Sequence, residues 1–337
     1  MRLLNMLFGA LILGALGWTG WWYAVATGQE EALERWFESR AEEGWQAEYA
    51  EISLTGFPTR LEREITEIRL ADPETGWAWA APRLVIESGP LGPTRFAVTW
   101  PGNQSFAVPG ESTEIASTAM ATRLELRPES ALALVRASAE TAGLDIKARS
   151  GWRASAAAFD ADVSERLNNE GYEIAFLAER VVLPKPLLAR LDPLGVAGPE
   201  IERMTVDGAA VFDRPLDRNV IEDGKLGLRE ATLRRAGFQW GEIRLEAKGE
   251  VRVDKKGYPV GDIDVTARHW RELLAMARRS GALRSEIASA IEGALELIAM
   301  IGGNRDELDV PLRFEDGRIW VGPVPVGDAP RLAPARS

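Results

Sequence analysis

Charged residues alternate with apolar or small residues along residues 242–254. A repeat of two is typical of a β-strand with one face in water. The alternation resumes over residues 262–267, after the polar stretch Lys255-Lys256-Gly257. The pattern therefore predicts a long antiparallel hairpin with one apolar face.

An apolar face of this length must be covered, and the residues on it are the candidates for a binding groove. The alternation leaves a dry core and an open groove equally possible, because both require the same pattern. The groove candidates are Ile243, Leu245, Val251, Val253, Ile263 and Val265.

Residues 269–301 change to a helical repeat, with apolar residues every three to four positions. This spacing predicts two amphipathic helices that break near Gly281. Three roles are open to these helices: a lid over the apolar face, a pair of interfacial membrane helices, or ordinary packing in the core. Their polar side mixes both charge signs and has no Lys/Arg-rich stripe, which favours core packing.

The rest of the chain consists mostly of short strand-like segments separated by Gly and Pro. We expect a helix at 128–142, turns at Asp207-Gly208 and Asp223-Gly224, and a final hairpin that turns at Asp316-Gly317. The proline-rich segment 184–194 predicts a boundary between a first β-rich subdomain, 30–193, and a second, 194–330. Residues 331–337 are expected to be a disordered tail.

The N-terminal segment carries no charge from residue 3 to residue 29. Residues 3–26 would be about 36 Å long as a helix, which is enough to cross the apolar part of a bilayer. An aromatic cluster near its end, typical of a membrane interface, contains Trp18, Trp21, Trp22 and Tyr23. We expect residues 1–29 to be a single transmembrane anchor, and a signal peptide cleaved after residue 26 is the alternative.

Composition excludes several classes of function. The net charge is −11 and basic residues form no cluster, which argues against nucleic-acid binding. The chain has no cysteine and one histidine, His269, so thiol chemistry and multi-histidine metal sites are excluded. We expect no cofactor, no metal and no catalytic residues, and therefore no enzyme.

Three local features have a structural explanation that we prefer to a functional one. Asp262 and Asp264 lie on the wet face of the hairpin and are expected to be solvated charges, although carboxylates also bind hard cations. His269 opens the helical region and is expected to cap or pack. Trp77 and Trp79 are expected to be a half-buried pair, although such residues also stack on sugars.

Several strings resemble a bacterial family of unknown function, the domain-of-unknown-function family 2125. They include Gly56-Phe57-Pro58-Thr59-Arg60, Asp254-Lys255-Lys256-Gly257-Tyr258-Pro259 and Val310-Pro311-Leu312-Arg313-Phe314. The chain also resembles, more distantly, the AsmA-like envelope proteins. That resemblance implies a membrane anchor, an extended periplasmic sheet curved into an apolar groove, and phospholipid handling or outer-membrane maintenance. It implies no catalytic residues.

Together these observations predict an α+β, mainly β fold of extended, curved antiparallel sheets, with a few amphipathic helices and one N-terminal transmembrane helix. We expect a single-pass inner-membrane protein with most of its chain in the periplasm. Its groove would bind phospholipid or another acyl-chain ligand. The alternative is a scaffolding protein with a closed core that recruits other envelope proteins.

Overall fold

The computed structural model describes residues 2–166, 171–281, 285–302, 306–322 and 324–332. Within these ranges it leaves out the side chains of residues 2–9, 222, 285–288, 290, 297, 298, 301, 302 and 324. The chain forms two compact units. Unit 1 comprises Met1–Glu125 and Ala148–Ser150, and unit 2 comprises Leu126–Lys147 and Gly151–Ser337.

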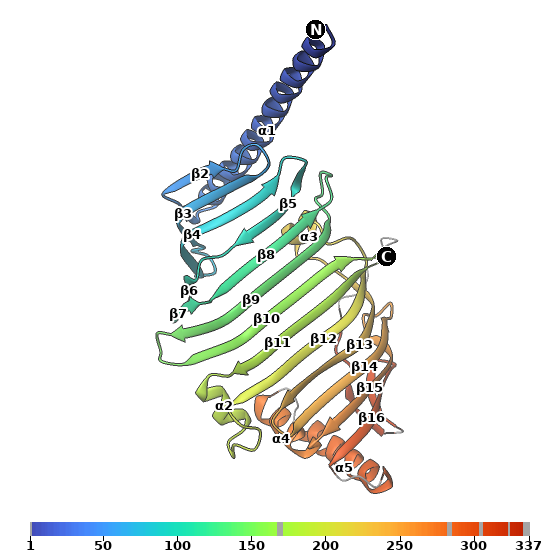
Figure 1. Cartoon of the computed structure of the whole chain (residues 1–337). Coiled ribbons are helices and arrows are strands. Elements are labelled where there is room, and N and C mark those ends of the chain that lie inside the picture. The colour runs from blue at the N-terminus through green and yellow to red at the C-terminus, as the bar shows by residue number, and fades with distance from the viewer. Residues whose placement is uncertain (1, 167–170, 282–284, 303–305, 323, 333–337) are drawn as a thin grey trace. The chain divides into compact units, whose positions relative to one another are not determined.

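Unit 1 is a long helix docked on an antiparallel sheet (Figure 1). Strand β3 pairs with β1, β2 and β4, and β4 pairs in turn with β5 and β6. Strand β7 pairs with β6, and β8 pairs with β5. The elements are α1 (Arg2–Glu42), β1 (Gln46–Glu48), β2 (Glu51–Thr55), β3 (Leu61–Ala71), β4 (Ala78–Gly89), β5 (Gly92–Thr99), β6 (Asn103–Val108), β7 (Glu111–Ala116) and β8 (Ala119–Leu126).

A buried arginine fixes α1 to this sheet. Arg63 of β3 is 4% exposed, and its guanidinium donates to Oε1 of Gln29 at 2.6 Å and to the carbonyl of Ala26 at 2.7 Å. Burial lowers the pKa of Arg63 from its usual value, while the nearby charge of Glu30 acts in the opposite direction. Because the charged group is buried, the helix oxygens must remain in place to solvate it.

Unit 2 is an antiparallel meander in which β9 to β18 pair in sequence order. The predicted central hairpin is confirmed as β14 and β15, and the predicted helical pair as α4 and α5. The elements are β9 (Leu134–Ala148), β10 (Arg153–Glu165), β11 (Tyr172–Val182), α2 (Lys185–Leu191), β12 (Glu200–Phe212), α3 (Arg218–Asp223), β13 (Leu228–Trp240), β14 (Ile243–Val253), β15 (Pro259–Arg268), α4 (Trp270–Ser280), α5 (Ser285–Gly302), β16 (Glu307–Glu315), β17 (Arg318–Val321) and β18 (Val324–Asp328).

Two apolar clusters hold the helices of unit 2 on its sheet. The first joins α4 and α5 to β15–β18 and includes Trp270, Leu274 and Val310. The second joins α2 and α4 to β12–β14, and at its centre are Trp240 and Ile243. The apolar face of the hairpin is therefore covered by helices in part.

The expected boundary near residue 193 does not coincide with the division between the units, which lies at Leu126. The segment around residues 184–194 is a short helix, α2, and not a linker. Its Leu188 and Leu191 pack into the second cluster of unit 2, so the segment is part of that core.

Three further predictions of local structure are wrong, namely the helix at 128–142 and the turns at Asp207-Gly208 and Asp223-Gly224. Residues 134–142 belong to strand β9, because pairing with β10 overrides the helix propensity of the alanines. Asp207-Gly208 is not a turn but lies inside β12, where the pairing with β13 shifts register. Asp223-Gly224 is the end of the short helix α3, and Gly224 has a φ of 64° there. Two residues of the expected tail donate hydrogen bonds to the turn between β14 and β15, Arg331 to the carbonyl of Lys256 and Leu332 to that of Gly257. Residues 333–337 lie outside the described residues.

The close approach of β14 and β15 predicts that Gly249→Ala destabilises unit 2. Gly249 has a φ of 150°, and a Cβ there would overlap the backbone oxygen of Asp262. We expect a loss of about 1–3 kcal/mol in the free energy of unfolding, measured by urea titration of the full chain in detergent. The control is Gly293→Ala in α5, where nothing lies within 4 Å, and it is expected to be neutral or stabilising. Equal stability of G249A and the native chain would contradict the prediction.

Candidate functional site

Unit 2 contains an apolar pocket of about 850 Å³ between its sheet and its helices. The sheet contributes residues from β12 to β18, and α4 and α5 contribute the opposite wall. Its walls are almost entirely carbon. The lining includes Leu183, Leu191, Ile201, Met204, Phe238, Trp240, Leu245, Val265, Trp270, Leu273, Met276, Ala277, Ser280, Ile291, Leu295, Val310, Leu312, Ile319, Val326 and Asp328.

The structure brings two of the six groove candidates to this pocket. Leu245 and Val265 line it, on the neighbouring strands β14 and β15. Ile243 is 0% exposed, packs in the cluster that contains Trp240 and is absent from the lining of the pocket, so it is core.

The remaining three candidates, Val251, Val253 and Ile263, are partly buried and do not line the pocket. They lie farther along the hairpin, toward its turn. The pocket therefore corresponds to the end of the predicted groove that lies next to α4.

Most pocket residues were missed by sequence reasoning because they come from distant strands. Met204 and Phe238 lie on β12 and β13, and Leu312 and Ile319 lie on β16 and β17. The alternation in the segment Leu308-Asp309-Val310-Pro311-Leu312 resembles that of the central hairpin and was the one signal available for the β16 residues. The volume left between sheet and helices has no signature in sequence.

Unit 1 contains a second, smaller apolar pocket of about 390 Å³. Leu33, Trp36 and Phe37 of α1 form one wall. The sheet side includes Ile65, Ile68 and Leu84. It also includes Trp77 and Trp79, whose rings contact Phe106 and Trp100 respectively. The indole N–H of Trp79 donates to Gln104 at 2.9 Å, so the polar atom of this ring is satisfied.

The aromatic residues expected at a membrane interface make protein contacts in unit 1. The indole N–H groups of Trp18, Trp21 and Trp22 donate to the carbonyls of Pro58, Pro90 and Arg60 at 2.8–3.0 Å. Trp22 is 3% exposed and packs against Leu61, whereas Tyr23 is 59% exposed. Within the part of the chain that the structure describes, no helix is both long enough and apolar enough to cross a membrane.

The polar residues singled out in the sequence, His269, Asp262 and Asp264, line neither pocket. His269 lies just before α4 with a φ of 55°, and its Nδ1 is 4.0 Å from the carboxylate of Glu272. Asp262 pairs with Arg313 of the next strand at 3.1 Å, and Asp264 is exposed, as expected for solvated strand charges. Among the described residues, no group of three or more His, Asp or Glu side chains is arranged to hold a metal ion.

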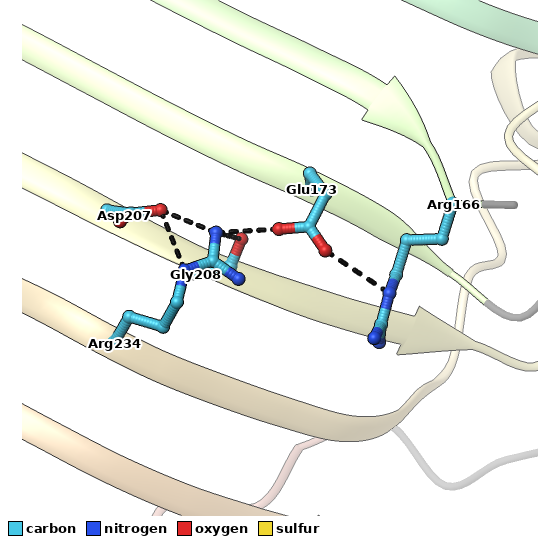
Figure 2. Close-up of polar contacts among 5 residues, drawn as sticks. All are labelled: Arg166, Glu173, Asp207, Gly208 and Arg234. Carbon is cyan, nitrogen blue, oxygen red and sulfur yellow. Dashed lines mark hydrogen bonds and ion pairs between the residues drawn. The ribbon is translucent and has the colours of Figure 1, made fainter.

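A cluster of charged side chains lies on strands β11–β13 of unit 2 and beside them (Figure 2). Arg234 is an extra residue of β13 at a bulge, and its side chain reaches across β12. It donates to Asp207 at 2.5 Å, to Glu173 at 2.6 Å and to the carbonyl of Gly208 at 3.2 Å. Glu173 also pairs with Arg166 at 3.2 Å. Since each carboxylate here is paired with an arginine, we interpret the cluster as a clamp on strand register.

The docking contacts of α1 predict that Trp22→Ala destabilises unit 1 far more than Tyr23→Ala. Removing a buried indole costs about 3 kcal/mol or more, and removing the exposed phenol costs on the order of 1 kcal/mol. The measurement is thermal unfolding of the full chain in detergent. Equal shifts for the two variants would show that Trp22 does not hold the helix on the sheet.

The arginine clamp predicts a pH-dependent contribution to stability. Hydrogen bonds from Arg234 lower the pKa of Asp207, so the folded state binds its proton less tightly than the unfolded state. The stabilisation is present above the unfolded pKa of about 3.9 and is lost as the pH falls through the folded value. We expect Arg234→Gln to lower the melting temperature at pH 7 and to have little effect near pH 2.

The matched control for this comparison is Arg235→Gln. Arg235 occupies the same bulge and makes one contact, to Glu246 at 3.3 Å. A loss of stability in R234Q that does not depend on pH, or an equal loss in R235Q, would contradict the role of the clamp.

Comparisons with known proteins identify a family and nothing narrower. No curated protein and no solved structure matches the chain. Residues 21–330 match the family described as "Uncharacterized protein conserved in bacteria (DUF2125)". This match covers both units and most of the chain, and it agrees with the strings noted in the sequence. The chain therefore belongs to the DUF2125 family.

Proposed function

We propose that the protein binds the acyl chain of a lipid in the unit 2 pocket and serves the bacterial cell envelope as a non-catalytic lipid-binding protein. The observation that carries this proposal is the pocket of about 850 Å³ between α4, α5 and the sheet. This volume lies within the range of about 300–1,000 Å³ that is usual for small-molecule sites.

The lining of the pocket favours an apolar ligand. A polar ligand would lose its hydrogen bonds to water and find few partners along walls such as Leu245, Phe238 and Leu312. A hydrocarbon chain would gain free energy in proportion to the apolar area it removes from water, about 25 cal/mol per Å². An elongated chain also fits a pocket that extends across the strands from β12 to β18.

The proposal includes an inner-membrane anchor in the N-terminal part of α1, with the sheets of both units in the periplasm. It is supported by the part of the uncharged run that precedes the contacts with the rest of unit 1 at Trp18, where the side chains of Leu11, Leu13 and Leu16 are 63–71% exposed. It is also supported by α1, which continues without a break from Arg2 to Glu42 and docks on unit 1. The resemblance to AsmA-like envelope proteins favours phospholipid handling as the role.

A second candidate function is a scaffolding protein whose core is closed. The observation that favours it is the cluster of buried residues beneath α4 and α5, which includes Trp270, Leu274 and Leu308. In that case the pocket would be a packing defect, and exposed surfaces would recruit envelope proteins.

A substitution that fills the pocket with a larger side chain distinguishes the two functions. Ala277 lines the pocket from α4, and Ala275 lies on the same helix outside the lining. We expect Ala277→Phe to reduce the lipid that co-purifies with the full chain severalfold, and Ala275→Phe to leave it unchanged. The measurement is lipid extraction and mass spectrometry of protein purified from bacterial envelopes, normalised to protein.

Absence of stoichiometric lipid from the native chain, or equal lipid in A277F and A275F, would contradict the proposed site. Recovery of a stoichiometric protein partner from a lipid-free chain would favour the scaffold.

A further inference from the structure

We propose that the ligand of the unit 2 pocket is an anionic amphiphile, and that its head group lies at the edge formed by α2 and the C-terminal end of α4. This inference rests on the proposed function and specifies the ligand of the same pocket. It comes from two arginines, Arg190 and Arg279, that stand beside the pocket and have no carboxylate partner among the residues that the structure describes.

Arg190, near the end of α2, reaches the last turn of α4. Its Nε donates to the carbonyl of Arg279 at 2.8 Å, and its Nη2 donates to the carbonyl of Ser280 at 3.2 Å. Ser280 is itself a lining residue of the pocket, so these bonds place the Arg190 guanidinium at the rim. The bonds to helix carbonyls leave its second terminal nitrogen, Nη1, available to a ligand.

Arg279 contributes a second cation on the same side of α4. It follows Met276 by three residues, and Met276 lines the pocket and packs in the cluster that contains Leu188 and Leu191 of α2. The Nε atom of Arg279 is buried and has no hydrogen-bond partner within the described part of the chain. A buried donor without a partner is costly, and an anionic oxygen would remove that cost.

The neighbouring charged side chains, Arg278 and Asp192, already have ion-pair or hydrogen-bond partners. Arg278 pairs with Glu292 of α5 at 3.8 Å. The carboxylate of Asp192, two residues after Arg190, accepts the backbone N–H groups of Val196, Ala197 and Gly198 at 2.8–3.3 Å. In the described ranges, neither Arg190 nor Arg279 has a carboxylate within 4.0 Å.

The opposite end of the pocket carries charge of the other sign. Asp328 of β18 lines that end, six strands away from β12 in the pairing order of the sheet. An anionic head group would be repelled by Asp328 and attracted by the two arginines. The charges therefore fix the orientation of the ligand, with its head at the α2 edge and its chain directed toward β18.

The test compares two probes that share a chain and differ in charge, tritiated hexadecanoate and tritiated hexadecanol. Each is bound by equilibrium dialysis to the full chain in dodecyl maltoside at pH 8. One charge-assisted hydrogen bond contributes about 1.5 kcal/mol or more, so we expect hexadecanoate to bind about tenfold more tightly than hexadecanol.

The variant Arg279→Gln is the main test because, within the described part of the chain, the Nε atom of Arg279 has no hydrogen-bond partner whose loss would loosen α4. We expect R279Q to reduce the preference for hexadecanoate severalfold while its affinity for hexadecanol stays unchanged. Arg190→Gln should act in the same direction. The matched control is Arg278→Gln, one residue away and paired with Glu292, which should keep the full preference.

Equal binding of the two probes to the native chain would overturn the head-group assignment and leave the proposed lipid pocket standing. An equal loss of preference in R278Q and R279Q would also overturn it, because the effect would then reflect overall charge. Binding of neither probe would contradict the proposed function, and this inference with it.

Discussion

The apolar face of the unit 2 sheet has to be kept out of water, and the rest of that unit depends on how this is done. From β12 to β18 the face is about 29 Å wide, and its strands shorten from about 44 Å in β12 to about 14–17 Å in β17 and β18, at about 4.8 Å between strands and 3.4 Å per residue. Helices α4 and α5 are about 17 and 27 Å long and about 10 Å wide. They cover roughly half of the face, so the space beside them is a consequence of the element lengths.

The two units solve the covering problem in different ways. Unit 1 uses the long helix α1, held by the buried Arg63 and by indole bonds to the loops of the sheet. Unit 2 uses α4 and α5, which lie between β15 and β16 in the chain, together with the short helix α2. An apolar pocket is left beside the covering helix in each case, and the larger one lies in unit 2.

The period-two pattern of residues 242–268 was sufficient to predict the hairpin, and the three-to-four repeat was sufficient to predict α4 and α5. Local patterns failed where pairing outweighs propensity, as in the alanine-rich β9, and where a bulge places Arg234 across a neighbouring strand. The pocket could be predicted in part, through Leu245 and Val265. Its other residues come from strands far apart in sequence, and an alternating pattern is the same for Ile243 in a closed core as for Leu245 in an open pocket.

The sequence alone could not identify Arg190 and Arg279 as residues at the edge of the pocket. Arg278 and Arg279 are adjacent and identical in type, yet Arg278 pairs with Glu292 and the Nε atom of Arg279 is buried without a partner among the described residues. The difference arises from the packing of α4 between α2 and α5, which brings Glu292 to one side of the helix and Arg190 to the other.

The most direct measurement is an experimental structure of the full chain, extracted from bacterial envelopes in a mild detergent, without added lipid. The account predicts continuous elongated density between α4 and the sheet, in contact with Leu245 and Val265, that ends beside Arg190 and Arg279. A pocket filled by protein side chains, with α4 and α5 closed onto the sheet, would contradict it.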